Sequence, residues 1–262
     1  MEAFYLRDGD GFVGTLMTQG GWHPDHQHGG PVQALLVRCV EAVPTLAPMQ
    51  ITRLTIDMIR PVPVDTRLDI DTRILREGKK IQLVEATLRV GDVEHVRSTF
   101  LRLRTADETG AAVPPSTTVE RVLPGPEDFT PVYRDLPHSP GFLRGIEMRR
   151  FPVPGSPEGV FGYWIRALPA LVEGEETLPL SRLAIAGDFT NSIGVLIEHD
   201  AVSAINADVN VQVLRPPRGD AIAVVGDTRF VLDRGLGISV AELHDREGVC
   251  AVATTSQLIQ SR

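Results

Sequence analysis

The sequence predicts an α+β fold in which one unit occurs twice, and each unit is an antiparallel sheet wrapped around one central helix. Three observations carry this prediction. Each half of the chain contains one strongly apolar helical segment, each such segment is followed by a series of β-rich segments, and the two series repeat one another in sequence. An internal repeat of this kind indicates that the same arrangement of strands and helix occurs twice, whatever the exact bounds of each element.

The composition is that of a globular protein with one large or two ordinary domains. The chain has 262 residues, of which 42% are hydrophobic and 23% charged. The net charge is −8 and no run of Lys or Arg is long enough to follow a phosphate backbone, so nucleic acid is not an expected partner. No apolar run approaches the ~20 residues of a membrane span. The N-terminus has no signal pattern, and Cys39 and Cys250 lie far apart in apolar segments, so we expect a cytoplasmic protein.

The first half begins with two short predicted strands in residues 4–17, joined by a turn at Asp8–Gly11. Apolar residues from Val32 to Val43 recur at the spacing of an amphipathic helix, which we expect to start at Pro31 and to end before Pro44. Three β-rich stretches follow, separated by turn-forming residues: ITRLTIDMI, RLDIDTRIL, and IQLVEATLRV with EHVRSTFLRLR.

The second half is organised around the stretch from Pro179 to His199, which predicts a helix surrounded by other structure. The first carboxylate within it is Asp188. A buried carboxylate costs several kcal/mol unless it is paired, so Asp188 is either held by partners or kept for chemistry. The alternative is a helix that ends near Gly187 and leaves Asp188 exposed in the following loop.

Strands are predicted on both sides of this helix. Residues 205–214 alternate, which puts Ile205 and three valines on one face of a strand and Asn206 with other polar residues on the opposite face. Residues 106–140 contain seven prolines and few periodic apolar positions, which predicts a surface linker. The expected organisation is an N-terminal unit at 1–105, a linker at 106–140 and a C-terminal unit at 141–262.

The two halves match at an offset of 155 residues (215 − 60), because Arg60 and Arg215 each follow a β-rich segment and precede a proline. Ser98 and Thr255 match at an offset of 157 (255 − 98), which predicts a two-residue insertion in an intervening turn. An antiparallel sheet wrapped around one helix is the hotdog arrangement. We therefore expect a double hotdog whose two sheets join edge to edge, which also covers otherwise exposed strands.

Several short motifs resemble the acyl-CoA thioesterase II family, the bacterial TesB-like double-hotdog thioesterases. They are HGGPVQALL at the start of the first helix, MIRP at 58–61, REG at 76–78, LAIAGDF in the second helix, and LRP at 214–216 before a closing strand with Ser and Gln. Their order and spacing cover nearly the whole chain. The resemblance implies hydrolysis of acyl-CoA to free acid and CoA in fatty acid metabolism, no metal or cofactor, and a homodimer or higher homo-oligomer.

In the family that this chain resembles, an Asp on the second helix, a Thr or Ser on the next strand and a Gln on the last strand position the attacking water. The resemblance assigns the Asp to Asp188 and the Gln to Gln257. The hydroxyl position falls on Asn206, which is a departure because an amide has no hydroxyl group. Ser203 takes its place if the alignment shifts by three residues. The structural alternatives are a surface glutamine at Gln257 and an outward-facing Asn206.

The loop HPDHQHGG at 23–30 supplies a second set of candidates. The backbone N–H groups of Gly29 and Gly30 precede the first helix, where the helix dipole favours developing negative charge. A similar HGG segment serves this purpose in other hotdog thioesterases, and we expect Gly29, Gly30, His28 and Asp25 to bind substrate. Two alternatives are kept for this loop. One is a site in the first half built on Asp25, and the other is a Gly-rich helix start whose histidines are solvated and have no role in the chemistry. The metal-capable residues crowd one loop without a distant fourth ligand, so no metal is expected.

Other enzyme classes fit the residues less well. Hotdog hydratases carry a catalytic His five residues after the Asp of a Gly-Asp pair, and that position here is Ile193. No G-x-S-x-G elbow of a serine hydrolase occurs. The non-enzymatic alternative is an acyl-CoA or acyl-lipid binding protein of the same fold, which the amide of Asn206 leaves open. Because Asp188 and Gln257 both lie in the second half, we expect one working site per chain, with the first half forming the opposing wall.

Overall fold

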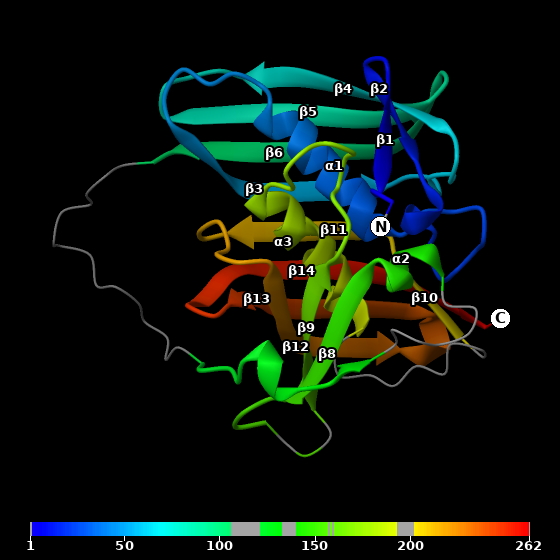
Figure 1. The fold of residues 1–262 in the computed structure, drawn as a ribbon, viewed down its shortest axis with the longest axis vertical. Helices are drawn as coiled ribbons and strands as arrows, with labels where there is room; N and C mark the ends of the chain where they lie inside the picture. Colours follow the sequence, from blue (N-terminus) through cyan, green and yellow to red (C-terminus); the bar gives the residue numbers. More distant parts are fainter. Residues whose placement is uncertain are drawn as a thin grey trace, which may run out of the picture.

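A computed structural model describes residues 2–105, 121–132, 140–156, 158, 160–192 and 202–261. Its main feature is one continuous antiparallel sheet with two helices packed on one face (Figure 1). The strand order is β1-β2-β4-β5-β6-β3-β11-β14-β13-β12-β9-β8-β7, and β10 also pairs with β14. In Figure 1 the strands of the first half lie at the top and those of the second half below, with α1 and α3 in front of the sheet.

The elements of the first half are β1 (Tyr5–Asp8), β2 (Gly11–Gly14), η1 (Leu16–Thr18), α1 (Gly29–Glu41), β3 (Met49–Met58), β4 (Arg67–Arg76), β5 (Ile81–Val90) and β6 (Val93–Arg104). Those that follow are η2 (Pro126–Asp128), β7 (Pro131–Val132), α2 (Gly141–Arg144), β8 (Ile146–Pro152), β9 (Phe161–Ala167), α3 (Pro179–Gly187), η3 (Asp188–Ser192), β10 (Val202–Asn206), β11 (Asp208–Val213), β12 (Ala221–Val231), η4 (Leu232–Arg234), β13 (Leu236–Asp245) and β14 (Gly248–Ser261).

The strand order is the same when read outward in both directions from the β3–β11 junction. On one side follow β6, β5 and β4, and on the other follow β14, β13 and β12. These are the strands that the sequence repeat matches. Separately, no helix among the described residues is long and apolar enough to cross a membrane. The two halves of the sheet are joined by antiparallel pairs such as Leu54 with Val211 and Ile56 with Val209, all of which are buried. Neither β3 nor β11 is therefore an exposed edge.

The predicted insertion between the repeats is wrong. Ser98 pairs with Ala86 in the first half, and Ala253 pairs with Ala241 in the second. Ala241 lies 155 residues after Ala86 (241 − 86), so the partner of Ser98 in the repeat is Ala253 at the same offset, not Thr255. Both hairpins close with two-residue turns, and both carry a register shift at matched positions near Leu88 and Leu243. The offset of 155 therefore holds through the whole hairpin.

The two central helices differ from their expected bounds. α1 begins at Gly29, two residues earlier than expected, and at the helix start Gly30 N lies 3.1 Å from Nδ1 of His28. α3 ends at Gly187 and continues as the 3₁₀ turn η3, so the predicted helix does not continue through Ser192. The remainder of the predicted helix, residues 193–199, lies outside the described residues. The Thr190 hydroxyl donates to Gly187 O at 2.6 Å, which satisfies one carbonyl at the helix end.

The two helices contact each other as well as the sheet. The Ser181 hydroxyl of α3 donates to Ala34 O of α1 at 3.1 Å, and Gly30 lies against the backbone of Ile185. These contacts bring the N-terminal end of α1 to the C-terminal end of α3. Two segments far apart in sequence thus meet at one point between helices and sheet.

Part of the proline-rich segment packs on the outer face of the second half. Leu123 and Phe129 contact a small apolar cluster that contains Phe151 and Trp164, separate from the main core between helices and sheet. The Trp164 indole N–H donates to Pro124 O at 2.9 Å. β7 extends the sheet beyond β8. Residues 106–120 and 133–139 of the predicted linker lie outside the described residues.

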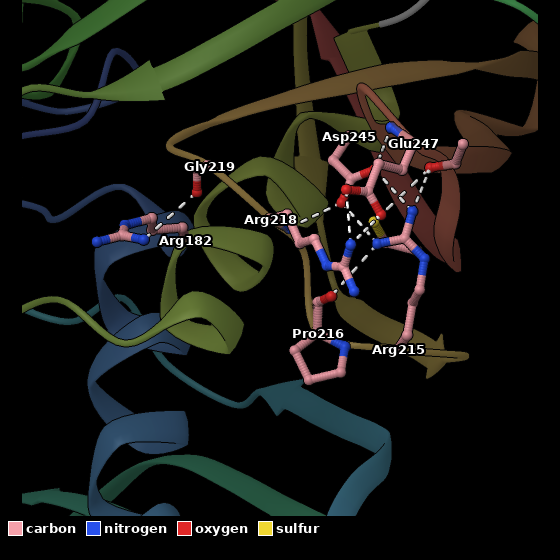
Figure 2. A network of polar contacts seen from close by, with 9 residues as sticks. Arg182, Arg215, Pro216, Arg218, Gly219, Asp245 and Glu247 are labelled. Atoms are coloured by element: carbon pink, nitrogen blue, oxygen red, sulfur yellow. Dashed lines mark hydrogen bonds and ion pairs between the residues drawn. The ribbon is translucent and has the colours of Figure 1, made fainter.

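A polar network holds the loop between β11 and β12 to the β13–β14 turn (Figure 2). The guanidinium of Arg215 makes two hydrogen bonds of 2.6 Å to Asp245, whose side chain is fully buried. The backbone N–H groups of Arg218 and Glu247 also donate to Asp245 at 2.7 Å. Burial alone disfavours the charged carboxylate, but the hydrogen bonds from Arg215 and the two backbone groups outweigh it and hold the pKa of Asp245 well below its ordinary value. The Arg-Pro motif of the second half is thus structural.

We expect Asp245→Asn to lower the free energy of unfolding by on the order of 3 kcal/mol at pH 7, because it leaves a half-buried guanidinium without its anion. The folded pKa of Asp245 is depressed, so the stabilisation is fully present above the unfolded pKa of about 4 and is lost as pH falls through the folded value. Urea unfolding at pH 7 and pH 3 measures the difference.

Asp92→Asn, in the matched and exposed turn of the first half, is the control and should change stability little at either pH. Equal stability of Asp245→Asn and wild type at pH 7 would contradict the role of the network.

Candidate active site

Asp188 lies where the two helices meet, directly after α3, and only 5% of its surface is exposed. Its Oδ1 atom accepts hydrogen bonds from Gln33 Nε2 at 2.8 Å and Asn206 Nδ2 at 3.0 Å. Its Oδ2 atom lies 2.8 Å from Nδ1 of His28. Gln33 and His28 come from the first half and Asn206 from the second, so both halves hold this one carboxylate. The prediction of a helix end near Gly187 is right, but the exposed Asp188 that accompanied it is wrong.

His28 directly precedes α1, and its Nδ1 atom lies between the start of the helix and Asp188. Gly30 N lies 3.1 Å from Nδ1 and Asp188 Oδ2 lies 2.8 Å from it. Two lone pairs cannot face each other at 2.8 Å without a proton between them, so we assign a proton to Nδ1 and a donated hydrogen bond to Asp188. The ring is stacked on Phe142 at a centroid distance of 4.1 Å and on Phe189 at 5.2 Å, which fixes its plane.

These contacts keep Asp188 ionised. Burial disfavours the charged form, but the charge and hydrogen bond of His28, the amide of Asn206 and the N–H of Gly30 outweigh burial. The pKa of the Asp188 carboxyl is therefore held below its ordinary value. At neutral pH the site holds a desolvated anion surrounded by donors.

Gly29 leaves the space that this carboxylate occupies. A Cβ atom on Gly29 would lie 2.7 Å from both carboxylate oxygens of Asp188 and 2.9 Å from Met58 Cε. Real Cβ atoms do not approach other atoms so closely, so any larger residue displaces Asp188 or the start of α1. Gly30, the other candidate of this loop, directs its N–H toward His28 and the carboxylate.

Asn206 points inward because the alternation of its strand is interrupted. β10 ends at Asn206 and β11 begins at Asp208, and Ala207 between them is outside both pairings with β14. This irregularity reverses the phase, so that Asn206 reaches Asp188 while Ile205 is exposed. The prediction that Asn206 and Ile205 follow the faces of residues 208–213 is wrong for this reason. Ser203, the alternative to Asn206, donates to Gln260 O at 3.4 Å.

Gln257 is buried and lies opposite Asn206 in the β10–β14 pairing. Its amide N–H group donates to the hydroxyls of Ser239 and Thr255. Its Oε1 atom is buried without a partner, and the same holds for Asn206 Oδ1 and Gln33 Oε1. Three amide oxygens without partners thus lie on residues that line or adjoin the Asp188 site. Such oxygens accept hydrogen bonds only, and a water molecule supplies the donors that they lack.

Asp25 does not belong to this cluster. Its side chain is 83% exposed, and the nearest cationic partner among the described residues is His23, at 3.9 Å. Within the described part of the chain, no three His, Cys, Asp or Glu residues are grouped closely enough to hold a metal ion.

Gln33 is the contact that the sequence analysis missed. It lies three, four and seven residues before Leu36, Val37 and Val40, which are all buried, so it is a polar residue on the apolar face of α1. A polar residue on an apolar helix face is the sequence feature that could have identified Gln33 as a site residue. Its partner, Asp188, is 155 residues away, and no local pattern predicts a contact over that distance.

The matched position in the first half is filled differently. The sheet registers match Asn206 and Gln257 to Ile51 and Arg102, which also pair with each other. The guanidinium of buried Arg102 donates to Val40 O and Val43 O at the C-terminal end of α1, and to Gln82. In the first half, an arginine thus donates to the carbonyl groups at the end of α1. At the end of α3, the second half has Asp188 and its amide partners.

Comparisons with known proteins agree with this fold. The acyl-CoA thioesterase N-terminal domain matches residues 18–103 and the acyl-CoA thioesterase C-terminal domain matches residues 116–260. A search of curated protein sequences finds no match.

Among solved structures, a putative thioesterase from Novosphingobium aromaticivorans is similar with a TM-score of 0.72 at 18% identity, over 98% of this chain and 99% of that one. A tesB protein from Mycobacterium avium subs paratuberculosis gives 0.69 at 17% identity, over 98% and 96%. A protein with a hot dog fold from Alicyclobacillus acidocaldarius gives 0.71 at 16% identity, over 98% and 95%. At these identities the structures establish the shared hotdog fold, and the domain matches establish the family.

Gly29→Ala should destabilise the protein although alanine normally favours a helix over glycine by about 1 kcal/mol. The added methyl group meets the Asp188 carboxylate. The matched control is Gly187→Ala, at the last residue of α3, where a Cβ atom would have its nearest neighbours at 3.5 and 3.8 Å. Thermal unfolding should give a lower Tm for Gly29→Ala and an unchanged or higher Tm for Gly187→Ala. Equal shifts in the two variants would mean that Gly29 does not limit the site.

Proposed function

Since this chain belongs to the acyl-CoA thioesterase family and is a thioesterase, we propose that Asp188, Asn206 and Gln257 position the water that hydrolyses acyl-CoA to free acid and CoA. The observation that carries this proposal is the convergence of donors from both halves of the chain on one buried, ionised carboxylate. Asp188 differs from the structural carboxylate of Asp245 in its neighbours, because Asn206 and Gln33, which donate to it, each keep a buried amide oxygen without a partner.

In this proposal the water lies against Asp188, and the amide oxygens without partners hold it there by accepting its hydrogen bond. Asn206 Oδ1 and Gln257 Oε1 each need a donor, and a water molecule donates to one of them and to the carboxylate. Asn206 thus performs with an amide oxygen what the family performs with a hydroxyl. Asp188 then exchanges one of its present hydrogen bonds for the water when substrate binds.

Hydrolysis forms a C–O bond to the water oxygen, breaks the C–S bond, and moves one proton from the water to the leaving thiolate. The water oxygen attacks the thioester carbonyl carbon while a water proton moves toward Asp188. The carbonyl oxygen becomes an oxyanion, for which the N-terminal end of α1, at Gly29 and Gly30, supplies the positive end of the helix dipole. Collapse of the intermediate breaks the C–S bond, and the CoA thiolate leaves and takes up the proton.

The palindromic strand order supports two hotdog units in one chain, residues 1–105 and 141–262, with residues 106–140 between them. The different residues at matched positions of the two halves support one working site per chain. The position in the first half that matches Gln257 holds Arg102, whose donors are taken up by the carbonyls of α1, and no carboxylate equivalent to Asp188 faces it with a set of amide partners among the described residues. The first half instead contributes His28, Gln33 and the start of α1 to the site of the second half.

Asp188→Asn should lower kcat for acyl-CoA hydrolysis by on the order of 10²-fold, because it removes the proton acceptor and keeps the shape. The assay mixes purified protein with acyl-CoAs of different chain length and a thiol reagent that reports free CoA. Asp25→Asn, in the exposed loop, is the control and should keep wild-type kcat.

Near-wild-type turnover of Asp188→Asn, or loss of turnover in Asp25→Asn alone, would move the chemistry away from Asp188. The binding-protein alternative predicts a different result, in which acyl-CoAs raise the Tm of the wild type and no free CoA appears.

Gln33→Leu tests whether Gln33 positions the carboxylate. Loss of the 2.8 Å hydrogen bond removes a donor from Asp188, so the pKa of Asp188 should rise and the acidic limb of kcat/KM should move to higher pH. We expect kcat to fall about tenfold, with a smaller change in KM.

Gln82→Leu, a buried glutamine on β5 that donates to Pro44 O, is the matched control and should lower stability without moving the pH profile. If both variants lose stability and neither changes the pH profile, Gln33 has only a packing role.

A further inference from the structure

Two buried hydroxyl groups lie beside the amide of Gln257 and take part in no step of the proposed mechanism. Ser239 on β13 and Thr255 on β14 are opposite each other in the sheet, and their exposed fractions are 1% and 3%. Nε2 of Gln257 donates to both hydroxyls, at 3.2 Å in the case of Thr255. The Ser239 hydroxyl also lies 2.7 Å from that of Thr228, its partner on β12. Three hydroxyls thus form one row across the sheet, on the same face as Gln257.

The matched positions of the first half carry no hydroxyl. At the offset of 155 residues, Ser239 matches Val84 on β5. Thr255 matches Phe100 on β6, and these two apolar residues also pair with each other. Both are fully buried in the main core. The fold therefore accepts apolar side chains at these two places, where a hydroxyl costs free energy unless it is hydrogen-bonded. The hydroxyls occur in the half that carries Gln257.

The hydroxyls bear on which way the Gln257 amide faces. An amide group has a donor side and an acceptor side, and its hydrogen bonds decide its orientation. Ser239 can donate to Thr228, which leaves its lone pairs for an N–H group of Gln257. When both hydroxyls accept from Gln257, its Oε1 atom lies on the opposite side of the amide, where it is buried without a partner. The reverse orientation would put two N–H groups in the place of this oxygen.

Gly237 leaves room for the amide oxygen. It pairs with Gln257 in the sheet, and a Cβ atom on Gly237 would lie 2.9 Å from Gln257 Oε1 and 2.8 Å from Phe230 Cδ1. Any larger residue therefore displaces the amide or the aromatic ring. Gly29 has the same relation to the carboxylate of Asp188. Two of the side chains assigned to the water thus lie against a glycine.

We propose that Ser239 and Thr255 are positioning residues, which hold the Gln257 amide with its oxygen toward the water. The inference rests on the proposed function, because it requires that Gln257 holds that water. A water that donates its hydrogens to Asp188 and to an amide oxygen keeps its lone pairs for the thioester carbonyl carbon. An N–H group in the same place takes up one of these lone pairs and makes the water a weaker nucleophile. The two hydroxyls therefore contribute to turnover without contacting substrate.

Removing both hydroxyls should turn the amide over. In the double variant Ser239→Ala with Thr255→Val, the N–H groups of Gln257 lose both acceptors, and Asn206 Oδ1 on the paired strand is an acceptor without a partner. We expect kcat for acyl-CoA hydrolysis to fall about tenfold with little change in KM. Thr255→Ser keeps the hydroxyl and should keep kcat close to that of the wild type. Each substitution is also measured alone, so the test does not depend on the folding of the double variant.

Ser98→Ala is the matched control for the loss of a buried hydroxyl. The Ser98 hydroxyl donates to Ala86 O at 2.7 Å, and the second half has Ala253 at the matching position. Ser98→Ala should lower Tm about as much as Ser239→Ala does and leave kcat unchanged. If Ser239→Ala and Thr255→Val lower Tm and also leave kcat unchanged, the hydroxyls have only a packing role and the proposal is overturned.

A double-mutant cycle separates this inference from the proposed function. Because the hydroxyls act through Gln257, their removal should lower kcat in the wild type and have no further effect in Gln257→Leu. An unchanged kcat in Gln257→Leu alone would contradict the proposed function, and this inference with it. A reduced kcat in Gln257→Leu, together with wild-type kcat in the variants without hydroxyls, overturns this inference only. An equal loss of kcat in both backgrounds overturns it as well, because the hydroxyls then act independently of Gln257.

Discussion

The structure depends on keeping one carboxylate buried and charged between the two halves of the chain. Asp188 has almost no access to water, and an isolated carboxylate in such a place costs far more than a folded domain can tolerate. His28 and Gln33 on one side and Asn206 on the other compensate for this cost. The orientation of α1 against α3, the small size of Gly29 and the irregular strand at Ala207 all serve these contacts. The groups that keep Asp188 charged thus come from both halves of the chain.

The two halves of the chain have matching strand pairings and different side-chain chemistry. The hairpins β5–β6 and β13–β14 share register, turn length and even the position of their register shift. On the inner face, Arg102 closes the end of α1, whereas Gln257 with Asn206 leaves open acceptors beside α3. On the outer face, ion pairs in the first half are replaced by valines in the second. Backbone hydrogen bonding holds the fold, so side chains on both faces are free to diverge.

Joining the sheets through β3 and β11 has a consequence for the site. The junction removes two sheet edges and places the start of α1 next to the end of α3. A positive helix end and a carboxylate from different units thus meet in one place. In this chain the partners of Asp188 come from both halves, so the arrangement around it needs both.

The sequence by itself determined the features that follow from local pattern. Apolar spacing after Pro31 gave α1, alternation gave most strands, and the spacing of Arg60 and Arg215 gave the repeat, because side-chain period and turn residues act over a few positions. Only the tertiary structure decided the contacts of Asp188. The sequence left two ends open for helix α3, and the structure has the earlier one, at Gly187. Asn206 turns inward because its strand has one extra residue opposite β14, and Gln33 meets Asp188 from 155 positions away. Such long-range pairings depend on how whole elements pack, and no local sequence pattern records them.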